Sequence, residues 1–349
     1  MPALAQHFGD TDRISFDRGE PSARPTHPAT QGVWTSVPDR NQSDDAEAAI
    51  APLADRPGPL TRAALNAAYP VLAALFTTRG RIAQPSHQPI VVYHMDGVGS
   101  THVTRSIRAS RSGCPVYDVQ TLTAGGIATM DAFYRSSGLP CLASGAHLLT
   151  SRYLAEQLER GVPTGRWKVI SLVRDPVARS LSHLFQLCHR HIADFEARCD
   201  TRRLDPISVF DQIQTAFPHG VQWMRWFNEE LRSVMGVDVF GVPFDRKAGH
   251  QVYSGRFADV LVIKTEQLGQ SGEATLRSFL GLKQFRWKRP DKRIRGKVGE
   301  RYAHFIGRLR LPASFVDHLY DYPELRHFYT AEELDGFRSR WCGARTGST

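Results

Sequence analysis

Short apolar runs alternate with helical stretches along this chain, and that alternation is the feature that most constrains its fold. The segments PIVVYHM (residues 89–95) and WKVISLV (Trp167–Val173) are rich in β-branched residues and typical of buried parallel strands. ADVLVIKTEQL (residues 258–268) has a third such run followed by a helical stretch. The pattern also predicts a strand at 115–119 and helices at 100–109, 150–160, 176–192 and 221–236. Together these elements predict an α/β fold of three layers, a parallel sheet with helices on both faces, plus extra helices toward the C-terminus.

The chain divides into two parts by composition. Residues 1–58 are rich in Pro, Ser, Thr, Asp and Ala without a sustained period, which is typical of a tail or linker. We expect residues 59–345 to form a single α/β domain. LTRAALNAAYPVLAALF (residues 60–76) has helical spacing interrupted by Pro70, so a helix or helix pair over 60–78 is expected to cap the domain.

The charge balance favours an anionic partner. The 349 residues include 44 Lys and Arg against 35 Asp and Glu, which gives a formal net charge of +9. Nucleic acid, a membrane surface and a phosphorylated cofactor all fit this balance, as does a solvated basic surface with no partner. Because no apolar run approaches the length of a membrane span and no signal pattern opens the chain, we expect a cytoplasmic protein with no transmembrane segment.

The five cysteines show neither CxxC spacing nor a Cys/His metal pattern. Their number is odd and they are scattered along the chain. We therefore expect reduced thiols and no metal site.

The first candidate site is the turn in HMDGVGSTHVTRSIR (residues 94–108). The predicted strand runs into Gly97 and Gly99, and Ser100 and Thr101 stand where helix N-caps are preferred. Glycines let a backbone approach a phosphate closely, and the free N–H groups of a helix start attract an anion. The Walker A pattern GxxxxGK[ST] is absent, and no Lys precedes Ser100, which disfavours a P-loop kinase or NTPase. An ordinary strand-to-helix turn explains the pattern about as well.

The second candidate site is RDPVARSLS, directly after the strand Trp167–Val173. Arg174 leaves the carboxyl end of this strand, and Pro176 is a typical first residue of a helix. Ser182 lies about two turns into that helix, so a guanidinium and a hydroxyl could converge on one phosphate. The alternative is that Arg174 and Asp175 form a local surface pair.

The two motifs together resemble those of sulfotransferases that use 3′-phosphoadenosine 5′-phosphosulfate (PAPS), which have a P-loop-type fold. The glycine turn resembles their 5′-phosphosulfate loop, and SLVRDPVARSLSHLF resembles their 3′-phosphate motif. The stretch from WFNEELRS to VLVIKTEQL (residues 226–268) is similar to one bacterial branch, the capsular polysaccharide synthesis proteins. The resemblance covers about residues 89–305.

The resemblance implies a sulfuryl transfer from PAPS to a hydroxyl acceptor, with a carbohydrate expected as the acceptor and adenosine 3′,5′-bisphosphate (PAP) as the product. It implies that Arg174 and Ser182 hold the 3′-phosphate of the nucleotide. It implies that His147, expected after a short strand in LASGAHLL (residues 142–149), is the general base, while a helix cap or core histidine is the alternative. The residues implied for the 5′-phosphate are those of the turn: Gly97, Val98, Gly99, Ser100 and Thr101.

One position departs from the family pattern. The family's loop usually carries a Lys or Arg where this chain has Gly97, with Asp96 beside it. Arg105, Arg108 or a residue of the basic stretch KRPDKRIRGKVGER (residues 288–301) could compensate, while a solvated basic surface explains that stretch about as well. A catalytically weak or inactive nucleotide-binding member of the family is the second hypothesis, and a basic nucleic-acid-binding protein is the third.

We expect two further groups of residues to have mainly structural roles. Glu266, at the end of the strand in VLVIKTE, is an alternative carboxylate base, but a structural role in anchoring a loop or helix is favoured. Trp223, Trp226 and Phe227 have helical spacing, and we expect them to be core residues and not a sugar platform.

Overall fold

A five-stranded sheet organises the chain. The computed structural model describes residues 69–71, 73–75, 88–110, 112–136, 142–161, 165–182, 224–288 and 304–342. All of them belong to one compact unit, Ser36–Thr349. The predicted tail at 1–58 lies outside the described residues, as does most of the predicted cap at 60–78. The described part of that cap, 69–71 and 73–75, is helical.

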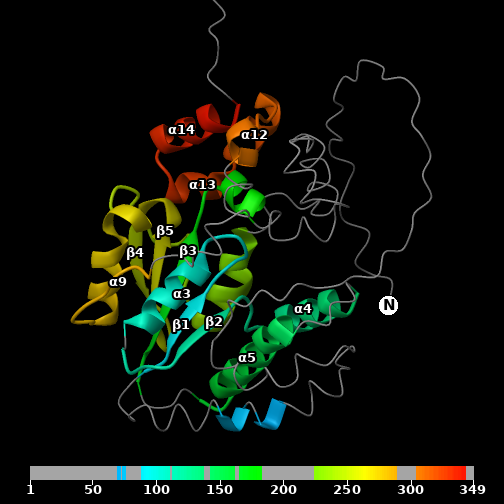
Figure 1. Ribbon diagram of the computed structural model, residues 1–349, viewed down its shortest axis with the longest axis vertical. Helices are drawn as coiled ribbons and strands as arrows, with labels where there is room; N and C mark the ends of the chain where they lie inside the picture. Colours follow the sequence, from blue (N-terminus) through cyan, green and yellow to red (C-terminus); the bar gives the residue numbers. More distant parts are fainter. Residues whose placement is uncertain are drawn as a thin grey trace, which may run out of the picture. The chain divides into compact units, whose positions relative to one another are not determined.

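The strands are β1 (Ile90–Tyr93), β2 (Val116–Val119), β3 (Trp167–Val173), β4 (His250–Ser254) and β5 (Ala258–Lys264). Their order across the sheet is β2-β1-β3-β5-β4, and the first four of these neighbours run parallel (Figure 1). β4 pairs with β5 in the antiparallel direction and forms an edge. The sequence pattern did not predict β4, because a short, half-exposed edge strand lacks the apolar run that marks a buried one.

The helices of the first half are α3 (Ser100–Ala109), α4 (Ala124–Ser136) and α5 (Leu142–Glu159). Those of the second half are η2 (Phe227–Met235), η3 (Thr265–Gln267), η4 (Leu268–Gly272), α9 (Glu273–Leu280), α12 (Ala313–Tyr320), α13 (Pro323–Phe328) and α14 (Ala331–Cys342). A further helix is described from 176 to 182. Figure 1 shows α12, α13 and α14 gathered beyond one end of the sheet.

Contacts of β2 place two helices on opposite faces of the sheet. The Tyr117 ring packs against Tyr153 of α5, with ring centroids 6.1 Å apart. The next residue, Asp118, accepts a hydrogen bond from Thr104 of α3. Because successive strand residues point to opposite faces, α5 and α3 flank β2 from its two sides.

The sheet is buried because its central strands are apolar throughout. Every residue of β1 is buried, and so are six of the seven residues of β3 and of β5. Such continuous burial is typical of a parallel strand covered on both faces, and it explains why these strands were predictable from composition. Lys264, which ends β5, is fully buried as well.

The chain reverses its direction of travel across the sheet at β1. From β1 it crosses through α3 to β2 on one side, and it later returns to β3 on the other side of β1. The turns that follow β1 and β3 therefore flank a topological switch point. Ligands of open α/β sheets bind in the crevice at the carboxyl ends of the strands there.

Candidate functional site

The turn after β1 has the predicted strand, glycine and helix geometry. Gly97 and Gly99 adopt positive φ angles of 77° and 87°, which glycine tolerates and other residues rarely adopt. Gly99 is the N-cap of α3, with no side chain bonded to the helix start and no acidic residue in the first turn. Val98, Ser100 and Thr101 complete the turn. The first turn of α3 therefore carries no carboxylate that would compete with an anion, although Asp96 lies directly before Gly97.

The turns after β3 and β5 bond directly to this glycine turn. Arg174 Nη1 donates to the Gly97 carbonyl oxygen at 2.8 Å. Thr265 Oγ1 donates to the Val98 carbonyl oxygen, also at 2.8 Å. Residues that lie 77 and 167 positions apart in the sequence thus meet at the carboxyl edge of the sheet. The two motifs singled out in the sequence form one site.

Arg174 has donors beyond the one it gives to Gly97. A guanidinium carries five N–H groups, and the bond to Gly97 is the only hydrogen bond of Arg174 among the described residues. Ser182 lies in the helix that begins at Pro176 and is half-buried. Its hydroxyl makes no hydrogen bond within the described part of the chain, so a ligand oxygen would not displace one.

Asp175 is an internal anchor of the site and does not form a surface pair with Arg174. Asp175 is buried, with an exposed fraction of 1%. Oδ1 accepts from the backbone N–H of Val177 at 3.0 Å, capping the helix at 176–182, and from the Tyr320 hydroxyl. Oδ2 accepts from Trp341 Nε1 at 2.8 Å. Burial raises the pKa of Asp175, although these bonds work in the opposite direction.

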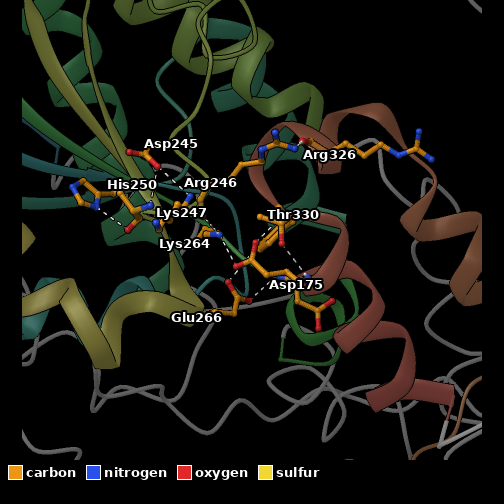
Figure 2. Close-up of polar contacts among 12 residues, drawn as sticks. Asp175, Asp245, Arg246, Lys247, His250, Lys264, Glu266, Arg326 and Thr330 are labelled. Atoms are coloured by element: carbon orange, nitrogen blue, oxygen red, sulfur yellow. Dashed lines mark hydrogen bonds and ion pairs between the residues drawn. The ribbon is translucent and has the colours of Figure 1, made fainter.

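Glu266 has the anchoring role that the sequence favoured. Its Oε1 accepts from the backbone N–H of Asp175 at 2.8 Å, and its Oε2 accepts from the Tyr329 hydroxyl at 3.2 Å. Figure 2 shows Glu266 next to Asp175, with Lys264 nearby. Burial raises the pKa of Glu266. Its two oxygens hold the turn after β3 to the C-terminal helices, and this accounts for the carboxylate without a catalytic role.

Lys264 ties the same helices to the end of β5. Its Nζ donates to the Arg246 carbonyl oxygen at 2.8 Å and to Glu333 Oε1 at 2.6 Å (Figure 2). The ammonium also lies 5.3 Å from the centre of the Tyr329 ring. A fully buried lysine is tolerated only with such partners. The C-terminal helices are therefore bonded to β5 and to both turns that follow β3 and β5.

His147 does not follow a strand. Residues 142–159 form the helix α5, and His147 lies inside it, so the predicted short strand at this position is wrong. The run LASGAHLL favours a helix because Ala and Leu are strong helix formers and no β-branched residue is present. The imidazole is 9% exposed, and its Nε2 has no hydrogen-bond partner among the residues that the structure describes. Burial lowers the pKa of His147, which keeps the ring neutral at pH 7.

His94 and Asp118 form a buried pair directly before the glycine turn. His94 Nε2 lies 2.6 Å from Asp118 Oδ1, and His94 Nδ1 lies 2.7 Å from the Met95 carbonyl oxygen. Both ring nitrogens face acceptors, so the imidazolium form satisfies both contacts. Burial opposes that charge, but the Asp118 carboxylate overcomes it and raises the pKa of His94. His94 in turn lowers the pKa of Asp118 against the effect of burial. Sequence reasoning missed this pair because His94 directly follows β1 and Asp118 lies in β2, 24 positions further along the chain.

A second missed residue is Arg179, five positions after Arg174. A Cβ placed on Gly97 would lie 2.5 Å from the Arg179 carbonyl oxygen and 3.2 Å from Arg179 Cγ. Burial lowers the pKa of Arg179 to about 10, and the charge of Asp96 counteracts the shift. The guanidinium stays protonated at neutral pH. The helical pattern of RDPVARS contained the signal, since Arg179 lies on the same helix as Ser182.

The candidates for the missing loop cation lie at different places in the structure. Arg108 Nη2 donates to the Val116 carbonyl oxygen at 3.1 Å, at the start of β2 and therefore at the edge opposite to the site. Arg105 lies in the middle of α3 and is half-buried. The backbone N–H of Lys288 donates to Ser106 Oγ at 3.0 Å, which places the first residue of the basic stretch against α3. The rest of that stretch, 289–301, lies outside the described residues.

The loop after β2 is fixed by one buried carboxylate. Glu230 of η2 accepts hydrogen bonds from the hydroxyls of Tyr93, Thr121 and Thr123. It also accepts from the backbone N–H groups of Leu122 and Thr123.

The aromatic residues of this region serve packing, as expected. Phe227 is fully buried, and Trp226 packs edge-on against Tyr93 and donates to the Gln120 carbonyl oxygen at 2.7 Å. Trp223 lies outside the described residues.

Metal and thiol groups add nothing to the site. Within the described ranges no group of three His, Cys, Asp or Glu side chains could hold a metal ion. Cys114 and Cys342 are both partly buried and form no disulfide among the described residues. Of the helices that the structure describes, none is both long enough and apolar enough to cross a membrane.

Comparisons with family models, with curated proteins and with solved structures found no match. The class that the fold defines is therefore an α/β protein with a mostly parallel five-stranded sheet and C-terminal helices, and no family assignment accompanies it.

Proposed function

We propose that this chain is a sulfotransferase that moves a sulfuryl group from PAPS to a hydroxyl acceptor. The observation that carries the proposal is the bond from Arg174 to the Gly97 carbonyl, which joins the two predicted anion-binding motifs at one edge of the sheet. Each motif alone has an ordinary structural explanation. Two such motifs that meet at the switch point of a parallel sheet favour a ligand with two phosphates. On this proposal the sheet is of the three-layer P-loop type, with helices on both faces.

The residues present fit such a nucleotide. The turn Gly97 to Thr101 offers backbone N–H groups at a helix start, where an added Cβ at Gly97 would meet backbone. These groups would hold the 5′-phosphate, and the Ser100 and Thr101 hydroxyls would add bonds. The donors that Arg174 does not give to Gly97 and the hydroxyl of Ser182 would hold the 3′-phosphate. The absence of a Walker A lysine favours PAPS over ATP.

The chemistry requires an aligned acceptor, a proton acceptor and stabilisation of the leaving phosphate. In the transfer, the bond between sulfur and the bridging phosphate oxygen breaks as a new bond forms between sulfur and the acceptor oxygen. His147 is the proposed base that takes the acceptor proton, because its ring is neutral and its Nε2 meets no hydrogen-bond partner in the described part of the chain. The helix start at Gly99 would stabilise charge on the departing phosphate.

A carbohydrate is the proposed acceptor. This part of the proposal rests on the resemblance of residues 226–268 to capsular polysaccharide synthesis proteins. Variable loops select acceptors in α/β folds, and several such segments fall outside the described residues.

A ligand titration tests the nucleotide assignment. Because a ligand that binds only the native state stabilises it, PAP at about 100 times its dissociation constant should raise the melting temperature by about 5 °C. ATP and GTP at equal concentration should raise it less. A protein that responds equally to all three, or to none, would not be a PAPS enzyme.

The Arg174→Ala variant tests the second motif. It should weaken PAP binding about 10- to 100-fold, since a charge-assisted bond to phosphate is lost. Calorimetric titration measures the change, and Arg160→Ala is the matched control because Arg160 is 72% exposed on α5's C-terminal side. Unchanged PAP affinity in Arg174→Ala would show that the motif does not contact the nucleotide.

An inactive nucleotide-binding protein is the second candidate, and the observation that favours it is Gly97 in place of a loop cation. It predicts tight PAP binding without sulfate transfer from PAPS to any hydroxyl acceptor. Transfer to a polysaccharide, followed as PAP release, separates the two candidates.

A further inference from the structure

Gly97 lies between two arginines of the same motif. Arg174 donates to its carbonyl oxygen at 2.8 Å. The backbone and stem of Arg179 occupy the space that a side chain at Gly97 would need, with the Arg179 carbonyl oxygen 2.5 Å and Cγ 3.2 Å from an added Cβ. The glycine turn and the start of the helix at 176–182 are therefore in direct contact. A lysine or arginine at position 97 has no room in this arrangement.

The contact at Gly97 involves two opposite charges, the Asp96 carboxylate and the Arg179 guanidinium. Asp96 precedes Gly97 and would repel a phosphate. Its carboxylate accepts a hydrogen bond from Gln120 and exerts a favourable charge interaction on Arg179. Burial opposes the Arg179 charge, and an anion bound in the turn would favour it. A guanidinium whose stem packs against the glycine turn is suited to stabilise a phosphate whose charge grows during reaction.

We propose that the Arg179 guanidinium replaces the missing loop cation and binds the 5′-phosphate of the nucleotide. The inference rests on the proposed function and adds a residue to it. In this arrangement the cation comes from the helix after β3 and not from the turn after β1. The helix carrying Arg179 and Ser182 would then contact both phosphates, the 5′ through one residue and the 3′ through the other.

Binding measurements with three nucleotides test the two phosphate sites separately. PAP carries both phosphates, 5′-AMP only the 5′-phosphate, and 3′-AMP only the 3′-phosphate. Arg179→Gln should weaken PAP and 5′-AMP about 10- to 100-fold and leave 3′-AMP within about twofold of the native value. Arg179→Lys should recover part of the loss. Arg108→Gln is the matched control, because Arg108 bonds at the opposite edge of the sheet.

A double-mutant cycle distinguishes ligand binding from neutralisation of Asp96. If Arg179 only balances Asp96, then Arg179→Gln should have no effect on 5′-AMP affinity in an Asp96→Asn background. We expect a loss of at least about tenfold in that background as well. No loss there would overturn the inference.

The remaining outcomes are also decisive. Equal losses for 3′-AMP and 5′-AMP in Arg179→Gln would assign Arg179 a purely structural role, and unchanged PAP affinity would remove it from the site. If PAP binds native protein no better than 5′-AMP, the PAPS assignment fails, while a loss of 5′-AMP in Arg179→Gln would still support a phosphate contact. Native protein that binds none of the three nucleotides would overturn both proposals.

Discussion

At the scale of single residues, buried carboxylates hold the loops that surround the crevice. Glu230 fixes the loop after β2, Asp175 caps the helix after β3, and Glu266 links that turn to the C-terminal helices. Each accepts hydrogen bonds from several donors, which offset part of the cost of burying its charge. These carboxylates thus have structural roles around the proposed phosphate site. Their donors come from distant segments, and only the folded chain brings them together.

Glu230→Gln should destabilise the protein by about 2 kcal/mol or more. The substitution places an amide donor against hydroxyl and backbone donors that now point at a carboxylate, and leaves some of them unsatisfied. Urea unfolding measures the change. Glu229→Gln, an exposed neighbour on the same helix, is the control and should shift stability by less than about 0.5 kcal/mol. Equal stability of the two variants would contradict the role given to Glu230.

The His94–Asp118 pair predicts a pH-dependent contribution to stability. The folded-state pKa of His94 is raised above 6.5, so its contribution is complete below 6.5 and declines as the pH rises through the folded value. The pKa of Asp118 is lowered below 3.8, so its contribution is present above 3.8 and declines in acid. The stability difference between native protein and Asp118→Asn should therefore be largest between about pH 4 and 6.5, and smaller at pH 9. Denaturant unfolding across this range measures it, and a difference that grew with pH above 6.5 would exclude the charged pair.

At the scale of elements, the site depends on turns that follow parallel strands. β1, β3 and β5 end at the same edge, and the turns after them bond to one another through Arg174 and Thr265. The glycine turn between β1 and α3 is tightly packed at Gly97, because the Arg179 backbone fills the space beside it. Gly99 has more room, with the nearest described atom 3.7 Å from an added Cβ.

Gly97→Ala should therefore be more harmful than Gly99→Ala. Both substitutions place a Cβ on a residue with positive φ, which costs about 1 kcal/mol. Only Gly97→Ala also forces a contact of 2.5 Å with a backbone oxygen, so its loss of stability should be greater by about 1 to 3 kcal/mol. Thermal unfolding of the two variants checks the order. Similar losses would mean that the turn and the helix at 176–182 separate easily.

At the scale of the whole molecule, the C-terminal helices are part of the site's support. Tyr320 of α12 and Trp341 of α14 donate hydrogen bonds to the carboxylate of Asp175. Tyr329, the residue after α13, donates to the carboxylate of Glu266. Sequence positions 320–341 thus stabilise the turn at 174–175. The short antiparallel β4 is the last strand on one side of the sheet, and β2 is the last strand on the other side.

Trp341→Phe should disturb the nucleotide site from a distance. The change keeps an aromatic ring but removes the indole N–H that donates to Asp175 Oδ2 at 2.8 Å. We expect a loss of about 1 to 3 kcal/mol in stability and a several-fold weaker PAP affinity, because the turn carrying Arg174 is less firmly held. Trp226→Phe, which loses a bond to the Gln120 carbonyl, is a control for the loss of an indole donor elsewhere. If PAP affinity were unchanged in Trp341→Phe, the C-terminal helices would have no influence on the proposed nucleotide site.

The sequence by itself determined the class of the fold and the position of both motifs. The strand at Trp167–Val173 and the helix at Ser100–Ala109 have the predicted bounds, because a buried run and an amphipathic stretch with an N-terminal glycine are local signals. The early start of α5 and the edge strand β4 escaped prediction, since helix propensity and a half-exposed pairing give weaker patterns.

The tertiary structure alone decided which residues share the crevice. Arg179 against Gly97, His94 with Asp118, and Asp175 beneath Tyr320 and Trp341 are contacts between segments far apart in sequence. Local pattern determines whether a segment becomes a strand or a helix, because backbone geometry and burial act over a few residues. Pairings across the sheet depend on strand order, which reverses at β1 and which periodicity along the chain does not encode.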